Sequence, residues 1–225
     1  MTRKMIDGSG YVRNLGMANV WNEIPLADYE SHMALPSVGQ ATLLSRELGR
    51  VAAKFKPDSL AILGAAGGNG LERPELNHIR RVIALDVNAK YLDVCAGRYA
   101  KRFKSFVPVT HDLNCGRPTF KPVDLIFAAL IFEYVRWQDV VQMLPSLLTA
   151  HGILAFVLQL PNRNTPVISR SPYVRLERLH ASFNHVNSRE LAERLSQVGF
   201  RRRETRKVSL GSGKSFHIGV YEIGF

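Results

Sequence analysis

The residues of this chain with the clearest chemical potential form a loop of small side chains. Residues 60–70 read LAILGAAGGNG, so an apolar run ends abruptly at Gly64. We expect a buried strand followed by a loop whose backbone approaches a ligand closely, because glycine and alanine put almost no side chain in the way. The loop has neither the G-x-G-x-x-G spacing of dinucleotide sites nor the Lys-Ser/Thr ending of phosphate-binding loops. A nucleotide-binding turn and an ordinary tight turn both remain open.

Two acidic residues stand where a nucleoside would need them. Asp86 ends the apolar run RVIALD, roughly 20 residues after Gly64, which is the separation expected for a carboxylate that accepts both ribose hydroxyls. A solvated acid at a strand end is the alternative reading of Asp86. Asp112 and Leu113 follow the next apolar run, so we expect the Asp112 carboxylate to accept from an adenine amino group and the Leu113 N–H to donate to the ring.

The net charge is strongly positive. Thirty Lys and Arg residues against nineteen Asp and Glu residues give a formal charge of +11. Such a charge favours nucleic acid, anionic lipid or an anionic metabolite, and it also occurs as plain surface charge. In a regular strand Arg201, Arg203 and Lys207 would face one way. Arg202 and Arg206 would face the other, so this run predicts no continuous basic patch.

The cysteines and the hydropathy of the sequence indicate the cellular compartment of the protein. Cys95 and Cys115 do not form a metal-like pair, so we expect neither a disulfide framework nor a metal site. The first residues, MTRKMIDGSGYVR, carry charges without a following apolar run, and no apolar window reaches the length of a membrane span. These features predict a cytoplasmic protein without a membrane span.

Apolar periodicity defines the elements that must position these residues. Apolar runs at 60–63, 81–86, 106–109, 123–130 and 153–160 alternate with helical patterns at 37–55, after Asn88, around 140–148 and after Asn187. Such alternation predicts an α/β fold with a mostly parallel sheet and helices on both faces. Runs at 202–209 and 215–223 are joined by only five residues, so we expect an antiparallel hairpin at the sheet edge.

Two further segments are expected to lie over the strand ends. Residues 1–56 are interpreted as an N-terminal arm and helix that cover the crevice, and residues 57–225 as the ligand-binding domain, within a single compact unit. Residues 161–187 form a polar, basic segment with a short helix around 174–180. Because this segment leaves the fifth strand, we expect it at the crevice mouth.

Together, the motifs of residues 57–225 resemble the class I S-adenosylmethionine-dependent methyltransferases. The resemblance rests on LAILGAAGGNG, VIALD, THDL, VDLIFAALIFEYV, HGILAFVLQLP and the closing hairpin. It implies a Rossmann-like, seven-stranded, mostly parallel sheet with a C-terminal antiparallel hairpin, and S-adenosyl-L-methionine as cofactor. It also implies that the methionine end of the cofactor meets Gly64, Ala65, Ala66 and Gly68, the ribose meets Asp86, and the adenine meets Asp112 and Leu113, with Asn69, Val87 and Ala128 completing the contacts.

The sequence departs from this family in two motifs. Ile62 stands where the family usually has an acid, and Ala66 replaces its second glycine. Alanine still lets the backbone approach, whereas the missing acid removes an expected partner for the cofactor's amino group. After the fourth strand the chain reads AALIFEYV instead of the Asn/Asp-Pro-Pro-aromatic signature, which counts against the amino groups of adenine or glutamine as methyl acceptors.

Candidate substrate contacts come from the arm and from the ends of the fourth and fifth strands. They are Tyr29, His32, Glu133, Tyr134 and Gln159. Each has a structural alternative, such as packing for the tyrosines or helix capping for Glu133. No catalytic residue is assigned, because transfer from a sulfonium mainly needs alignment and exclusion of water.

Three functions follow from the resemblance. The leading hypothesis is methyl transfer by in-line displacement to a small-molecule or lipid-like acceptor, since no recognition module is appended. The positive charge keeps open an RNA or ribosomal-component methyltransferase. The residue at position 62 keeps open a non-catalytic S-adenosylmethionine-binding or regulatory protein. The sequence does not indicate an oligomeric state.

Overall fold

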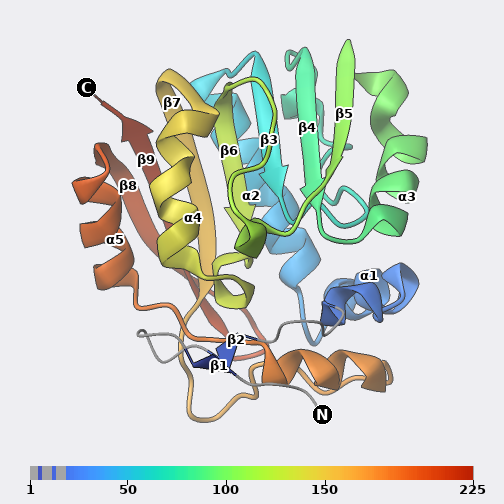
Figure 1. The fold of residues 1–225 in the computed structure, drawn as a ribbon. Coiled ribbons are helices and arrows are strands. Elements are labelled where there is room, and N and C mark those ends of the chain that lie inside the picture. The colour runs from blue at the N-terminus through green and yellow to red at the C-terminus, as the bar shows by residue number, and fades with distance from the viewer. Residues whose placement is uncertain (1–4, 7–11, 14–18, 225) are drawn as a thin grey trace.

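A seven-stranded mixed sheet forms the centre of the structure, a computed structural model that describes residues 5–6, 12–13 and 19–224 (Figure 1). The strand order is β5-β4-β3-β6-β7-β9-β8. The parallel strands are β3 (Ser59–Leu63), β4 (Arg81–Asp86), β5 (Ser105–Thr110), β6 (Val123–Ala129) and β7 (Leu148–Gln159). The hairpin of β8 (Phe200–Ser209) and β9 (Ser215–Ile223) places β9 antiparallel to β7. The predicted fold class is confirmed.

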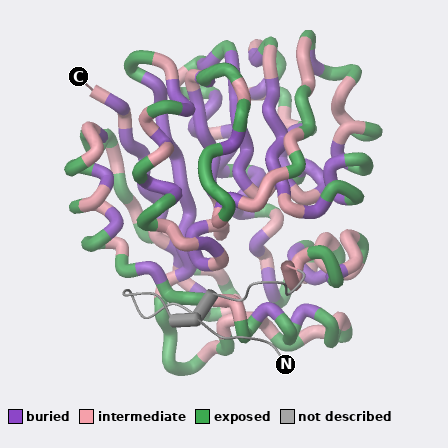
Figure 2. Tube along the Cα trace, in the orientation of Figure 1, coloured by how far each residue is buried: buried purple, intermediate pink, exposed green. Residues whose placement is uncertain are grey.

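Helices cover both faces of the sheet. One face carries α2 (Gln40–Phe55) and α3 (Ala89–Tyr99), and the other carries α4 (Trp137–Met143) and α5 (Ser188–Gln197). Side chains alternate along β3, so Leu60 packs with Leu48 of α2 while Leu63 lies in the cluster that contains Val140 of α4. Buried residues follow the central strands in Figure 2. The parallel strands therefore have two covered faces, as their continuous apolar sequences require.

Short helices complete the described part of the chain. The 3-10 helices are Val20–Asn22, Pro74–Leu76, Ala100–Arg102, Leu113–Cys115, Phe132–Tyr134, Leu144–Leu147 and Val174–Ala181. The last of these confirms the short helix expected around 174–180. Strands β1 (Met5–Ile6) and β2 (Val12–Arg13) form a separate antiparallel pair.

Helix ends follow the predicted capping residues. The Asn88 side chain accepts a hydrogen bond from the Lys90 N–H at 3.0 Å at the start of α3. Asn187 accepts from the Arg189 N–H at 3.0 Å at the start of α5. Helix α2 begins at Gln40, later than predicted, because Gly39 adopts a left-handed conformation with φ of 67° just before it.

Strand β7 is longer than its apolar run predicts. Helix α4 ends at Met143, and β7 begins at Leu148 and continues through His151 and Gly152, which precede the apolar run predicted at 153–160. Pairing with β6 shifts register between Val123 and Leu125, and His151 has a φ of 62°. A bulge thus absorbs the irregular residues, and the strand continues through them.

A second bulge changes the faces of the basic residues in β8. Pairing with β9 shifts between Arg202 and Glu204, which leaves Arg203 unpaired in the ladder and reverses the alternation after it. Arg206 therefore lies on the same face as Arg201, and Lys207 lies on the same face as Arg202, so the predicted faces of Arg206 and Lys207 are wrong. Arg206 pairs with the fully buried Glu47 of α2, and Arg203 pairs with Glu222 of β9 at 2.5 Å.

Two segments that are distant in sequence lie together at the carboxyl ends of the parallel strands. Helix α1 (Leu26–Ala34) and the Val174–Ala181 helix are neighbours there (Figure 1). We call residues 19–35 and 161–187 the cap. Ile24, Leu176 and Leu179 form its small buried cluster, separate from the two clusters on the sheet.

The predicted division into an arm with a helix at 1–56 and a ligand-binding domain at 57–225 remains a proposal, and part of the arm lies outside the described residues. The described residues before it include helix α2, whose Leu48 and Val51 pack in the same apolar cluster as β3. None of the helices formed by residues 19–224 is long and apolar enough to cross a membrane.

Candidate functional site

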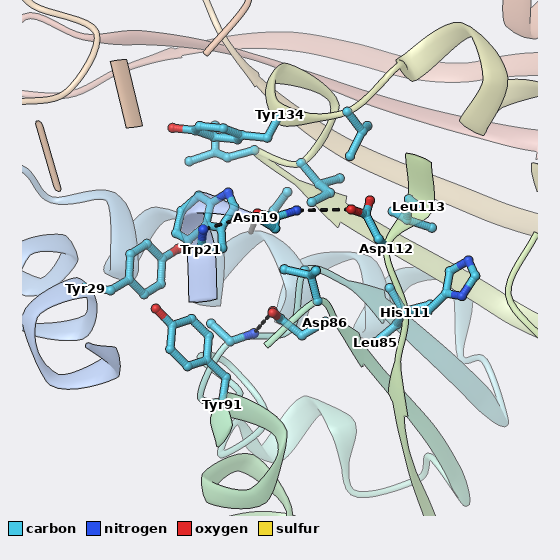
Figure 3. Close-up of a pocket in the computed structure, with 17 residues that line it drawn as sticks. Asn19, Trp21, Tyr29, Leu85, Asp86, Tyr91, His111, Asp112, Leu113 and Tyr134 are labelled. Carbon is cyan, nitrogen blue, oxygen red and sulfur yellow. Dashed lines mark hydrogen bonds between the residues drawn. The ribbon is translucent and has the colours of Figure 1, made fainter. Parts of the chain in front are cut away.

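A cleft of about 610 Å³ opens at the carboxyl ends of β3, β4, β5 and β6 (Figure 3). We call it the strand-end cleft. From the sheet side it is lined by Gly64, Ala66, Leu85, Asp86, Val87, His111, Asp112, Leu113, Ala129, Leu130, Ile131, Tyr134 and Val135, and Tyr91 of α3 adjoins them. Asn19, Trp21 and Tyr29 close it from the cap. Parallel strands bring their carboxyl ends to one edge, which is why residues far apart in sequence meet here.

Asp86 is the central polar group of this cleft. Its carboxylate accepts hydrogen bonds from the Ala66 N–H at 2.8 Å and from the Asn88 N–H at 2.9 Å, one on each oxygen. Burial raises the pKa of Asp86, and the backbone hydrogen bonds oppose that shift. Each carboxylate oxygen has a second lone pair, so Asp86 can still accept two hydroxyl groups.

The second acid, Asp112, ties the sheet to the cap. One oxygen accepts from the Asn114 N–H at 2.9 Å, and the other accepts from the Asn19 side chain at 3.2 Å (Figure 3). Two more bonds hold the same segment. The Asn88 side chain donates to the Trp21 carbonyl at 2.9 Å, and the Tyr91 hydroxyl donates to the Ile24 carbonyl at 2.7 Å. Polar contacts with Asp112 after β5 and with the start of α3 thus hold the cap over the cleft.

The small-residue loop has tight neighbours. Gly64 has a φ of 75°, and a Cβ there would lie 3.1 Å from Ile131. Gly68 lies against α3, where a Cβ would come within 2.8 Å of the Cys95 sulfur. The loop continues into turns and the Pro74–Leu76 helix, without an α-helix. It therefore offers no α-helix N-terminus to a phosphate group.

A second cavity, of about 950 Å³, lies on the other side of this loop. We call it the loop cavity. It contains charged side chains from three elements, namely Glu30 of α1, Glu72 after the loop and Arg98 of α3. Arg98 donates to Glu30 at 2.5 Å and to the Gly67 carbonyl at 3.2 Å. Ile62 also lines this cavity, so acids from other elements stand near the position where the sequence lacks one.

A third cavity, of about 460 Å³, lies between the cap and the sheet. We call it the cap cavity. Its wall contains Tyr29, His32, Tyr134 and Gln159, four of the five predicted substrate residues. Trp21, Tyr29, Leu130 and Tyr134 line both the cap cavity and the strand-end cleft. Tyr29 borders all three cavities.

The structure separates the predicted cofactor residues into groups. Gly64, Ala66, Asp86, Val87, Asp112 and Leu113 meet in the strand-end cleft, and Ala65 and Asn69 line the loop cavity. Gly68 and Ala128 line none of the three cavities. Ala128 is fully buried in the core on the opposite face of β6, because alternate strand residues point to opposite sides.

Glu133, the fifth predicted substrate residue, also lies outside the cavity walls. Its fully buried carboxyl accepts from the Gln159 N–H at 2.7 Å. Burial raises the pKa of Glu133 to about 7. Glu133 thus holds the end of β7 from behind the cap cavity.

Many residues that line these cavities were not predicted from the sequence, and four of them bear on the chemistry of the site. Asn19, Trp21 and Tyr91 line the strand-end cleft, and Lys214 lines the cap cavity. Trp21 offered a usable signal, because a large aromatic residue in an irregular, polar segment needs a partner. Lys214 follows a glycine-rich hairpin turn and resembles a solvent-exposed turn residue, so its pattern gave no signal.

Comparison with known proteins identifies the fold. Neither a protein-family model nor a curated protein matches the sequence. Among solved structures, the N-methyltransferase NodS of Bradyrhizobium japonicum WM9 in complex with S-adenosyl-L-homocysteine is similar with a TM-score of 0.62, 15% identity, and coverage of 92% of this chain and 99% of that one. An S-adenosylmethionine-dependent methyltransferase of Mesorhizobium loti has a TM-score of 0.58 and 15% identity, with coverage of 74% of this chain and 90% of that one. The [4+2]-cyclase SpnF has a TM-score of 0.59 and 13% identity, with coverage of 79% of this chain and 81% of that one.

The chain thus has the class I S-adenosylmethionine-dependent methyltransferase fold. The resemblance inferred from its motifs is confirmed at the level of fold. Because SpnF shares the architecture under the name of a cyclase, the fold alone does not define the reaction.

Proposed function

We propose that this protein binds S-adenosylmethionine and transfers its methyl group to a small molecule held in the cap cavity. One observation carries the proposal. The residues that line the strand-end cleft include Asp86 and Asp112 and, within 19–224, no Lys or Arg, although the whole chain carries a charge of +11. Two carboxylates repel a phosphate-bearing nucleotide, whereas they favour a nucleoside with a positive charge.

The residues of the strand-end cleft fit the adenosine part of this cofactor. Asp86 has one free acceptor site on each oxygen, which matches the two hydroxyls of a ribose. Val87 and Leu113 supply apolar side chains on either side, and Asp112 can accept from an exocyclic amino group. Trp21 and Tyr134 close the cleft from above, edge to face at 5.1 Å between ring centroids.

The loop cavity fits the amino-acid part. Glu30 and Glu72 can accept from an ammonium group, and Arg98 can donate to a carboxylate. These residues replace the missing acid at position 62. Because Tyr29 borders all three cavities, a ligand that spans the strand-end cleft and the loop cavity has its middle beside Tyr29 and the cap cavity.

When bound in the strand-end cleft and the loop cavity, the cofactor would supply an activated methyl group, whose in-line transfer to the acceptor's electron pair would leave the sulfonium as a neutral thioether. The task of the chain is alignment and exclusion of water, effects that can lower a barrier by about 7 to 11 kcal/mol. Trp21, Tyr29 and Tyr134 line both the strand-end cleft and the cap cavity where the two meet, and their contacting rings keep water away from this junction. His32 lines the cap cavity, and burial together with the charge of Lys214 lowers the pKa of its imidazole.

The cap favours a small acceptor over RNA. It covers the strand ends, and the cap cavity is mostly apolar, whereas an RNA site would present aromatic and basic side chains along an open groove. Several arginines that contribute to the positive charge are paired within the protein, as Arg206 with Glu47 and Arg98 with Glu30. These observations support the small-molecule acceptor.

Calorimetric titration tests the proposed function. We expect S-adenosylmethionine and S-adenosylhomocysteine to bind with a stoichiometry of about one, and NAD and ATP to give no heat at the same concentrations, because the described residues lining the strand-end cleft include no Lys or Arg and the loop presents no α-helix N-terminus to their phosphates. Binding of NAD or ATP without the sulfur nucleosides would overturn the assignment. Retention on RNA that weakens steeply with salt would support the RNA alternative instead.

A further inference from the structure

A buried lysine lies at one end of the cap cavity. Lys214 closes the Leu210–Lys214 turn and is only 2% exposed. Its ammonium donates to the Val167 carbonyl at 2.6 Å and reaches the Gln159 side-chain oxygen at 3.4 Å. Among residues 19–224 no carboxylate pairs with it, and burial lowers the pKa of Lys214 to about 8. A buried cation is costly unless an anion compensates it, and the described protein supplies none.

The other polar groups of the cavity gather around this lysine. The Gln40 side chain donates to the same Gln159 oxygen that Lys214 reaches, at 3.4 Å. His32 is held by a 2.9 Å hydrogen bond with the Ser171 hydroxyl, and the charge of Lys214 contributes to lowering the pKa of the imidazole. This end of the cavity therefore carries one positive charge and several hydrogen-bonding groups.

The rest of the cavity is apolar. Its remaining lining consists of Trp21, Tyr29, Met33, Leu130, Tyr134, Val167, Ile168, Leu176, Leu179 and Phe183. Four of these, including Tyr29 and Tyr134, form the wall shared with the strand-end cleft. The cavity thus has a charged end at Lys214 and an apolar, largely aromatic end that faces the proposed methyl donor. Such an arrangement fixes the orientation of a small ligand.

We propose that the cap cavity binds a small organic acid, with its carboxylate on Lys214 and an apolar or aromatic body extending toward Tyr29 and Tyr134, where a hydroxyl or amino group on that body would supply the electron pair for methyl transfer and release its proton to solvent. As the identity of the methyl acceptor, this inference rests on the proposed function. A single ammonium balances a single negative charge, so a carboxylate fits better than a phosphate dianion. The side-chain amides of Gln40 and Gln159 can donate to the second carboxylate oxygen after a small rotation.

Two probes of equal shape test the charge recognition. 3-Phenylpropanoate and its neutral amide, 3-phenylpropanamide, are titrated into the wild-type protein by ligand-observed NMR, with and without saturating S-adenosylhomocysteine. We expect the acid to bind at least tenfold more tightly than the amide, as hydrogen bonds to a charged partner imply. Equal affinity of the two probes, or tighter binding of the amide, would overturn the proposal.

A matched pair of variants locates the effect. Lys214→Met removes the buried charge and keeps the apolar stem, while Lys207→Met removes an exposed charge from the same hairpin. We expect Lys214→Met to abolish the preference for the acid and Lys207→Met to retain it. Loss of the preference in both variants, or in neither, would contradict a role for Lys214. If Lys214→Met does not fold, the relative affinities of the wild-type protein for the acid and the amide still test the proposal.

The same titrations separate the two proposals. Lys214 lies outside the strand-end cleft and the loop cavity, so Lys214→Met should bind S-adenosylhomocysteine as the wild-type protein does. Wild-type protein that binds S-adenosylhomocysteine but shows no preference for the acid would refute the organic-acid inference alone. Wild-type protein that prefers the acid but binds neither sulfur nucleoside would refute the proposed function and leave an acid-binding cavity.

Discussion

The strand ends and the cap face each other across the same cavities, yet they are held together in different ways. On the sheet side, Asp86 and Gly64 follow strands whose side chains are covered on both faces by two large apolar clusters. On the cap side, the described apolar cluster has three buried residues, Ile24, Leu176 and Leu179. Polar contacts, such as that of Asn19 with Asp112, also hold the cap to the sheet. This difference predicts that the sheet side is rigid and that the cap opens locally to admit ligands.

Hydrogen exchange should show the largest difference between the two regions. Amides of β3 and β6 are expected to exchange through global unfolding, whereas amides of α1 and of the 174–181 helix open locally with a free energy lower by at least about 3 kcal/mol. Saturating S-adenosylhomocysteine should slow exchange in the cap, because Asn19, Trp21 and Tyr29 line its proposed site. Equal protection of cap and sheet would contradict a separable cap.

Glu133 links the two regions, and its ionisation should affect stability. Its carboxyl supports the Gln159 N–H, and its carbonyl accepts from the Asn184 N–H of the cap at 2.8 Å. Because burial raises the pKa from 4.5 to about 7, the folded state binds more protons than the unfolded state between these values. The contribution of Glu133 to the free energy of unfolding is therefore greatest below about pH 4.5. It falls as the pH rises through 7, by up to about 3 kcal/mol.

Glu133→Gln should remove that dependence. The neutral amide can still accept from the Gln159 N–H, and no charge has to be buried at high pH. Urea unfolding at pH 5 and pH 8 measures the effect. The wild-type protein should lose more stability between the two values than the variant, and an identical loss in both would show that Glu133 does not titrate as described.

Asp86→Asn tests the donor side without altering its shape. We expect S-adenosylhomocysteine affinity to fall about 30-fold, roughly 2 kcal/mol, because hydrogen bonds to a charged acceptor contribute about 1.5 to 3 kcal/mol. Asp93→Asn, an exposed change on α3, serves as the control and should leave the affinity unchanged. Unaltered binding in Asp86→Asn would mean that the ribose lies elsewhere.

Asn19→Ala should produce the smallest effect and act on the cap alone. It removes two part-buried hydrogen bonds of 3.2 Å, the one that Asn19 donates to Asp112 and the one that it accepts from the Trp21 N–H, with a combined contribution of about 1 kcal/mol because both are long and partly solvated. Exchange of the amides at 20–24 should become about fivefold faster, with little change in β3. Asn22→Ala, which alters an exposed side chain of the same turn, is the matched control. A global loss of stability in Asn19→Ala would show that the cap and sheet unfold as one unit.

The sequence predicts the sheet side well because its determinants are local. Apolar runs define the five parallel strands, Asn88 and Asn187 begin their helices, and the spacing of Gly64 and Asp86 brings them to one cleft. Each of these features depends on residues within one strand-helix-strand unit, where hydrophobic period and capping chemistry dominate.

The acceptor side could be predicted only in part, because it depends on contacts between distant segments. Tyr29 and His32 line the cap cavity, whereas Glu133 lies behind it and Lys214 reaches it from the hairpin between β8 and β9. The bulge at Arg203 likewise follows from pairing with β9 and not from its own sequence pattern. Long-range packing decides such positions, and no local pattern encodes it.

A crystal structure of the complex with S-adenosylhomocysteine tests the central claim most directly. The account predicts the ribose hydroxyls on the Asp86 carboxylate, the amino-acid end in the loop cavity beside Glu30 and Arg98, and the sulfur next to Tyr29, facing the cap cavity. A nucleoside that binds outside the strand-end cleft, or one whose sulfur is turned away from the cap cavity, would contradict it.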